Sequence, residues 1–271
     1  MDKVFAPQYG RNSDGWIEFP RSDRYERIKV FPEEVMGHPA MLNMFVQQEI
    51  IDYVSEEGDI LLDPMSGTGT IMLAALFNRK VVCIELEEHF HKLQHQVKQH
   101  LAFNEEIANN ITLLHGDCRL FLPIPCNHII TSPPYGNAMK ITKVRELKEG
   151  SDNYFAKQDA RMLEYSKSPR NLSRLNTFMY NQEMAKIYRL CYQSLPSGGT
   201  MTIIIKDRMK GEDRVWLSNW VTKVCVTVGF KVSEWFKWHA TGTMYTNVRR
   251  QQGLETVDVE EIMVFRKGEG K

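Results

Sequence analysis

Residues Asp63–Thr70 read Asp-Pro-Met-Ser-Gly-Thr-Gly-Thr, and the rest of the chain can be placed relative to this stretch. It follows an apolar run at Ile60–Leu62 and leads into another at Ile71–Leu76. This pattern predicts a buried strand, a glycine turn and a helix. Gly67 and Gly69 allow backbone conformations that a β-carbon would hinder, so a ligand can lie close to the main chain there.

A second apolar strand is predicted at Lys80–Ile84, and it ends at Glu85. An acidic residue about twenty positions after such a turn is placed to accept hydrogen bonds from a ribose. The unit is therefore predicted to bind a cofactor that contains a nucleoside. A dinucleotide fingerprint would have a third glycine where Met72 stands, and a P-loop would have a lysine after the turn. On these residues alone, an ordinary strand-to-helix turn stays open.

Strands and helices are predicted to alternate along the chain. Helices are expected at 41–54, 87–103, 178–195 and 215–228, and further strands at 111–114, 128–131, 200–206, 230–238 and 259–266. This alternation indicates an α/β fold with a doubly wound, mostly parallel sheet. We expect one domain over 1–271, with an irregular N-terminal arm at 1–37 and Pro39 in the first turn of the helix that follows.

Composition narrows the class of protein. The chain has 271 residues, and no apolar run approaches the length of about 18 residues that spans a membrane. Its start lacks a signal-peptide core, so we expect a cytoplasmic protein without a membrane partner. Five cysteines without CxxC pairing favour reduced thiols. With 34 basic and 34 acidic residues, overall charge does not indicate a nucleic-acid partner.

Local charge does indicate such a partner. Residues 137–177 lack clear hydrophobic periodicity and contain nine lysines and arginines against five acids. An inserted basic segment of this kind is predicted to bind nucleic acid. Its candidate contact residues are Lys140, Lys143, Arg161, Lys167, Arg170 and Arg174.

The fourth predicted strand runs directly into Ser132-Pro133-Pro134-Tyr135. Two prolines fix two φ angles and remove two amide donors, which leaves a stiff backbone rich in acceptor carbonyls. With the Ser132 hydroxyl and the Tyr135 ring, this corner can hold a planar base amine and accept its N–H hydrogens. Accepting both hydrogens favours the pyramidal, nucleophilic form of the amine. A Pro-Pro loop that merely ends a strand is the open alternative.

Taken in order, these motifs resemble the amino-methylating DNA methyltransferases, which use S-adenosylmethionine to methylate N4 of cytosine or N6 of adenine. The resemblance is close over residues 36–136 and looser beyond. It implies a class I, Rossmann-like methyltransferase fold, S-adenosylmethionine as cofactor and DNA as partner. Ser132 stands where Asp or Asn is commoner, which slightly favours N4 of cytosine. No separate target-recognition domain of about a hundred residues follows the corner.

The resemblance also implies roles for individual residues. Ser132, Pro133, Pro134 and Tyr135 match the catalytic corner. Cofactor binding is implied for His38, Pro39, Asp63, Pro64, Met65, Gly67, Gly69, Thr70, Glu85 and Asp117.

Other chemistries are weaker candidates. His91 and His95 have a spacing that can bind zinc, but no third ligand is evident, so we expect no metal. Cys126 follows a proline, as the nucleophile of cytosine-C5 methyltransferases does, but it precedes the fourth strand instead of following it. An RNA base methyltransferase and a non-catalytic nucleotide-binding module remain as alternative functions.

Overall fold

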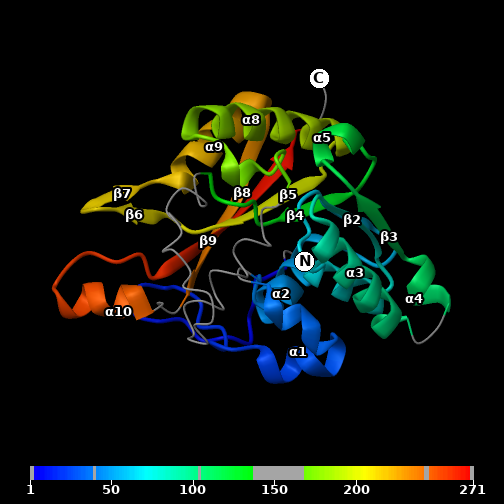
Figure 1. Cartoon of the computed structure of the whole chain (residues 1–271), viewed down its shortest axis with the longest axis horizontal. Coiled ribbons are helices and arrows are strands. Elements are labelled where there is room, and N and C mark those ends of the chain that lie inside the picture. Colours follow the sequence, from blue (N-terminus) through cyan, green and yellow to red (C-terminus); the bar gives the residue numbers. More distant parts are fainter. Residues whose placement is uncertain (1–2, 39–40, 103–104, 137–167, 241–243, 269–271) are drawn as a thin grey trace, which may run out of the picture.

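The computed structural model describes residues 3–38, 41–102, 105–136, 168–240 and 244–268. Its main sheet has seven strands in the order β3-β2-β1-β4-β5-β9-β8 (Figure 1). β9 is antiparallel to both of its neighbours, and the other paired strands are parallel. The predicted doubly wound, mostly parallel fold is confirmed. The strands are β1 (Ile60–Asp63), β2 (Lys80–Glu85), β3 (Ile111–His115), β4 (His128–Thr131), β5 (Thr200–Ile205), β8 (Phe230–His239) and β9 (Val259–Lys267).

Two hydrophobic cores lie on the two faces of the sheet, because side chains of a strand alternate between faces. Leu61 packs into the core that contains residues of α2 (Met44–Val54) and α3 (Glu88–Leu101). Its neighbour Leu62 packs into the core of α8 (Thr177–Ser194) and α9 (Leu217–Val228). Figure 1 shows these two pairs of helices on opposite sides of the sheet.

The N-terminal region, predicted to be an irregular arm, is irregular over residues 3–23 but not over residues 24–37. It contains α1 (Arg24–Val30) and the 3-10 helix η1 (Glu33–Gly37). Phe5 stacks on Phe236 of β8, with ring centroids 4.3 Å apart. The aromatic residues of the N-terminal region therefore pack into the core that contains residues of α2 and α3, at the β8 edge of the sheet.

Some element boundaries also differ from the predictions. α2 starts at Met44 instead of near Pro39, because the Asn43 side chain caps it by accepting the Phe45 N–H at 2.9 Å. The unpredicted hairpin of β6 (Arg208–Lys210) and β7 (Asp213–Val215) delays the start of α9. The remaining elements are η2 (Thr70–Phe77), α4 (Glu105–Asn109), α5 (Cys118–Phe121), η3 (Leu172–Arg174) and α10 (Met244–Gln251). Among the described residues, no helix has the length and apolar character needed to cross a membrane.

The strand order places a crevice between β1 and β4. From β1 the chain builds outward through β2 and β3, and it then returns to add β4 and β5 on the other side. In open α/β sheets, ligands bind at the carboxyl ends of the strands where the order reverses. Asp63 ends β1 and Thr131 ends β4, so the glycine turn and the proline corner both start at this crevice.

Candidate active site

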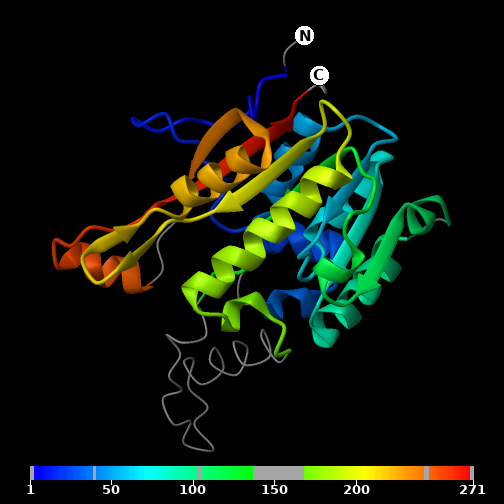
Figure 2. The ribbon, with the colours of Figure 1, turned by 90° about the horizontal axis from the view of Figure 1, so that it is seen from above.

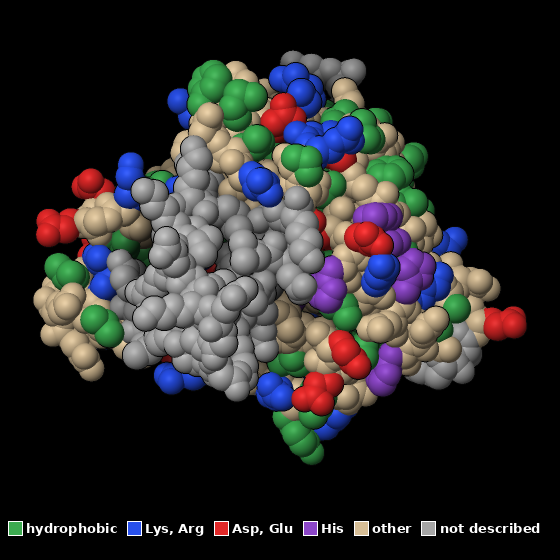
Figure 3. Space-filling model, in the orientation of Figure 1, with side chains coloured by type: hydrophobic (Ala, Val, Ile, Leu, Met, Phe, Trp, Pro, Cys, Tyr) green, Lys and Arg blue, Asp and Glu red, His purple; other side chains and the backbone are tan. Residues whose placement is uncertain are grey.

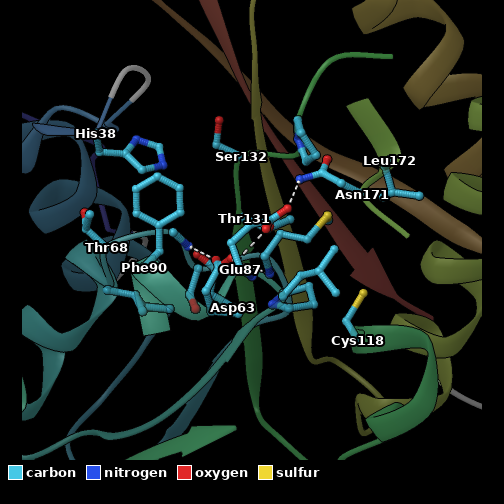
Figure 4. Close-up of a pocket in the computed structure, with 18 of the residues that line it drawn as sticks. His38, Asp63, Thr68, Glu87, Phe90, Cys118, Thr131, Ser132, Asn171 and Leu172 are labelled. Atoms are coloured by element: carbon cyan, nitrogen blue, oxygen red, sulfur yellow. Dashed lines mark hydrogen bonds between the residues drawn. The ribbon is translucent and has the colours of Figure 1, made fainter. Parts of the chain in front are cut away.

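A pocket with about 970 Å³ of empty space, its open mouth included, lies at the crevice. Figure 4 shows part of its lining, with Ser132 between His38 on one side and Asn171 on the other. The pocket brings together most of the predicted cofactor-binding and catalytic residues. These are His38, Asp63, Pro64, Met65, Gly67, Thr70, Glu85, Asp117, Ser132 and Pro134.

The other predicted catalytic and cofactor-binding residues are not among the described residues that line the pocket. Pro133 is buried and is not among the described lining residues. Tyr135 is also absent from the lining; its hydroxyl oxygen accepts a 3.0 Å hydrogen bond from the Lys206 N–H, directly after β5. Pro39 lies outside the described residues, as do Lys140, Lys143, Arg161 and Lys167.

The glycine turn contributes through its main chain. Gly67 lines the pocket with φ 53°, and its N–H donates a 2.7 Å hydrogen bond to Glu85 Oε2. Gly69 has φ 81° but is not among the lining residues; a β-carbon there would collide with the Met72 methyl group. The predicted need for glycine is confirmed at both positions. At Gly69, which does not line the pocket, the structural reason is the left-handed backbone conformation.

Glu85 is buried at the end of β2 with both carboxylate oxygens hydrogen-bonded to backbone. Oε2 accepts from Gly67 and Oε1 accepts from the Glu87 N–H, each at 2.7 Å. Burial raises the pKa of Glu85 to about 8, against the opposing effect of these two hydrogen bonds. A carboxylate oxygen can accept more than one hydrogen bond, so both oxygens retain capacity for ribose hydroxyls.

Gln94 supports the turn from α3, and the sequence analysis did not identify it. Its Nε2 donates hydrogen bonds of 2.7 Å to Ser66 Oγ and to the Gly67 carbonyl. Gln94 is fully buried between Leu93 and Val97 on the inner face of the helix. A polar residue on an apolar helix face was the signal available in the sequence.

Two further predicted residues are tied to the surrounding fold. Asp63 Oδ1 accepts hydrogen bonds from Thr131 Oγ1 at 2.8 Å and from the Met65 N–H at 3.0 Å. Removal of its carboxyl group from water raises the pKa of Asp63 to about 7. The Thr70 hydroxyl accepts a 3.0 Å hydrogen bond from the guanidinium of Arg27, which is buried in α1.

Asp117 caps α5 and binds Arg119, a lining residue that was not predicted. Asp117 Oδ1 accepts from the Arg119 backbone N–H at 3.0 Å and from its Nε at 2.8 Å. Burial of the Asp117 carboxyl raises its pKa, but the bonds from Arg119 outweigh this, and the pKa lies below its ordinary value. Arg119 Nη1 also pairs with Glu183 Oε2 of α8 at 2.6 Å.

One pocket wall comes from the end of the predicted basic segment. Arg170, Asn171 and Leu172 line the pocket, so Arg170 lies beside the predicted cofactor site. Glu87, which the sequence analysis missed, accepts a 2.8 Å hydrogen bond from Asn171 Nδ2 (Figure 4). Arg174 ends η3 and is not among the described lining residues.

The histidine pair of α3 lies away from the pocket lining. His91 Nε2 and His95 Nε2 are 3.2 Å apart, and the His115 ring stacks on His91 with centroids 4.8 Å apart. Figure 3 shows histidine side chains exposed around α3. Within the described residues, no group of three or more His, Cys, Asp or Glu is arranged to hold a metal ion.

Sequence comparison decides the family. The sequence model of the N6/N4 methyltransferases, described as DNA methylases, matches residues 7–96 and 126–271. The chain belongs to this DNA methylase family. No curated protein matches the chain in sequence.

Two solved structures with TM-scores above 0.5 share the fold of this chain. A S-adenosylmethionine-dependent methyltransferase from Methanosarcina mazei matches at 10% identity and TM-score 0.52, covering 82% of this chain and 98% of that chain. The glycopeptide N-methyltransferase MtfA, solved with sinefungin, matches at 12% identity and TM-score 0.51, over 84% and 88%. TrmN from Thermus thermophilus matches at 16% identity and TM-score 0.49 over 83% of this chain, which spans 49% of the TrmN chain.

For a member of this DNA methylase family, S-adenosylmethionine is the cofactor and methyl transfer is the reaction. The pocket fits a nucleoside with an amino-acid tail. Glu85 and Asp117 supply acceptors at the ends of β2 and β3, and Gly67 exposes main chain between them and His38.

Proposed function

We propose that this DNA methylase modifies an exocyclic amino group of a flipped DNA base, with N4 of cytosine favoured over N6 of adenine. The observation that carries the proposal is the position of Ser132. It is exposed on the lining of the pocket that also contains Glu85, directly beyond the end of β4. A hydroxyl placed there is within the same cavity as the predicted cofactor acceptors.

In this proposal the proline corner prepares the amine. S-adenosylmethionine supplies an electrophilic methyl group when it is bound. The Ser132 hydroxyl and the Pro133 carbonyl accept the two N–H hydrogens and turn the amine lone pair toward the pocket. The amine loses one proton on methylation, and the exposed position of Ser132 gives that proton a path to water.

Tyr135 is proposed to position the base. Its hydroxyl accepts a hydrogen bond from the Lys206 backbone N–H, which ties the ring of this last corner residue to the end of β5. Stacking of a base on such a ring contributes about 1–3 kcal/mol. A base inside a duplex cannot reach the pocket, so it must be flipped out or come from a single strand.

A covalent route through cysteine is disfavoured. Cys126 is buried, and burial raises its pKa to about 12, so the thiol stays protonated at neutral pH. It is also not among the described residues that line the pocket. The amine mechanism requires no thiolate, and Cys126→Ala should retain activity.

Contacts between the protein and the DNA backbone must offset the free-energy cost of flipping the base out of the duplex, which is a few kcal/mol. We assign this role to the basic segment 137–177, with contributions from the β6–β7 hairpin and from α10. Figures 1 and 2 show that the hairpin and α10 extend from the same side of the molecule, with a gap between them in Figure 1. Arg208 and Lys210 of β6 are basic residues in this region.

Transfer of tritium from labelled S-adenosylmethionine tests the proposal with three samples: DNA, structured RNA and no acceptor. We expect label in DNA. Label in RNA alone would establish the RNA methyltransferase alternative. No label in any sample, with the cofactor bound, would favour a non-catalytic nucleotide-binding module.

A further inference from the structure

Residues Ser168–Leu172, here named the pocket strap, connect two regions with different proposed roles. Three of them, Arg170, Asn171 and Leu172, form a wall of the cofactor pocket. The strap belongs to the basic segment 137–177 that we propose to contact nucleic acid. The other end of this segment begins directly after Gly136, beside the proline corner.

The first attachment of the strap is Glu87, whose side chain is buried. Its carboxylate accepts hydrogen bonds from the Ser168 N–H at 3.1 Å and from Asn171 Nδ2 at 2.8 Å. The backbone N–H of the same Glu87 donates to Glu85 Oε1 at 2.7 Å. Glu87 is therefore hydrogen-bonded both to Glu85, the predicted ribose acceptor, and to the strap.

The second attachment is Arg119. Its Nη2 donates to the Arg170 carbonyl at 3.2 Å and to Asp117 Oδ2 at 2.5 Å. Arg119 thus joins the strap to the other predicted acidic cofactor residue. The inner end of the strap is fixed by Asn171 Oδ1, which accepts from the N–H and the hydroxyl of buried Ser173 at 3.0 and 2.7 Å.

We propose that Glu87 and Arg119 are positioning residues that couple cofactor binding to nucleic-acid binding through the pocket strap. A ligand that contacts Glu85, Asp117 and the strap wall stabilises the hydrogen-bonded arrangement of all three. The strap then holds one end of the basic segment in place for nucleic acid. Coupling of this kind is reciprocal, so each ligand raises the affinity for the other. The nucleic-acid half of this inference rests on the proposed function.

Amide hydrogen exchange tests the strap without nucleic acid. With saturating sinefungin, we expect exchange of the amides of residues 168–176 to slow in the wild-type protein. In Glu87→Ala the slowing should be lost, and in Glu87→Gln it should persist, because Gln Oε1 can still accept the Asn171 hydrogen bond. Unchanged exchange at 168–176 in wild-type protein that binds sinefungin would overturn the proposal.

Anisotropy of a labelled mixed-sequence DNA duplex tests the coupling. Sinefungin should raise the DNA affinity of the wild type at least about fivefold. Glu87→Ala and Asn171→Ala should lose this increase. Glu88→Ala should keep it, because Glu88 pairs with Lys92 on the surface at the same helix start. An equal increase in Glu87→Ala and wild type would contradict the proposal. If the wild type binds no DNA in either state, the proposed DNA substrate fails, and hydrogen exchange alone decides the strap.

Discussion

Thr131 Oγ1 donates a 2.8 Å hydrogen bond to Asp63 Oδ1, which joins the last residue of β4 to the last residue of β1. The glycine turn follows Asp63 and the proline corner follows Thr131. This one bond therefore links the start of the predicted cofactor loop to the start of the proposed catalytic corner. The hydrogen bond between the two strand ends therefore helps to fix the spacing of the two motifs.

Asp63→Asn should flatten the pH dependence of stability. The folded-state pKa of Asp63 is raised to about 7, so the native carboxyl keeps a proton that the unfolded chain loses near its ordinary pKa of 3.8. In the wild type, its contribution to stability falls as pH rises from about 4 to 7, by up to about 1.4 kcal/mol per pH unit. Asparagine keeps the Oδ1 acceptor but cannot ionise.

Urea unfolding at pH 5 and pH 8 measures this effect. The loss of unfolding free energy between the two pH values should be smaller in Asp63→Asn than in the wild type. A remaining loss is expected, because the raised pKa of Glu85, about 8, acts in the same direction. An identical loss of unfolding free energy in both proteins would show that ionisation of Asp63 does not cause the pH dependence.

Glu85→Ala should weaken S-adenosylmethionine binding at least about tenfold, since a charge-assisted hydrogen-bond pair contributes on the order of 1.5–3 kcal/mol. Calorimetry gives the affinity, and circular dichroism controls for the fold. Unchanged affinity would show that Glu85 does not hold the ribose.

The affinity of the wild type should also rise between pH 7 and pH 9. Ribose hydroxyls donate to the ionised carboxylate, and the Glu85 carboxyl of the free protein ionises with a pKa of about 8. Glu85→Gln carries no titrating group there, so its pH profile corrects for titration of the ligand's own amino group. Parallel profiles for the two proteins would be incompatible with this prediction.

The two turn glycines should respond differently to alanine. At Gly67 a β-carbon would lie 3.2 Å from His38 Nε2 in the pocket, so Gly67→Ala should reduce cofactor affinity. Gly69 is not among the lining residues, so Gly69→Ala should leave the affinity nearly unchanged. Both variants should lose about 1–2 kcal/mol of stability, because both positions have a left-handed backbone. Calorimetry and urea unfolding on both variants check this. A loss of cofactor affinity in Gly69→Ala but not in Gly67→Ala would contradict this prediction.

Tyr135→Ala should lower turnover strongly and leave cofactor affinity nearly unchanged. It removes stacking worth about 1–3 kcal/mol together with base positioning. Tyr135→Phe keeps the ring but loses the hydrogen bond from the Lys206 N–H, so a smaller loss is expected. Single-turnover methylation rates separate the two variants. Equal activity of Tyr135→Ala and wild type would exclude the stacking role.

Much of the fold could be predicted because its signals are local. Apolar runs such as Ile60–Leu62 and turn residues such as Gly67 act within a few positions of sequence, and both were placed correctly. α1 was missed because it lacks an apolar period. Its Arg27 is instead buried by pairing with Asp23 at 2.6 Å and with Thr70.

The pocket residues that were missed depend on distant partners. Glu87 binds Asn171, and Arg119 binds Glu183, across long stretches of chain that no local pattern connects. Arg170 was assigned to nucleic acid on charge alone, and only the path of the chain near the end of the basic segment places it at the pocket. A run of basic residues in the sequence can indicate the class of partner, but only the folded structure shows which of these residues lie at a given site.

Mass spectrometry of nucleosides from DNA of cells expressing the protein tests the central claim most directly, with Ser132→Ala as the matched control. We predict N4-methylcytosine, or N6-methyladenine if adenine is the target, in cells with the wild type and a strong reduction with Ser132→Ala. The appearance of 5-methylcytosine, or methylated RNA without any methylated DNA base, would contradict the account.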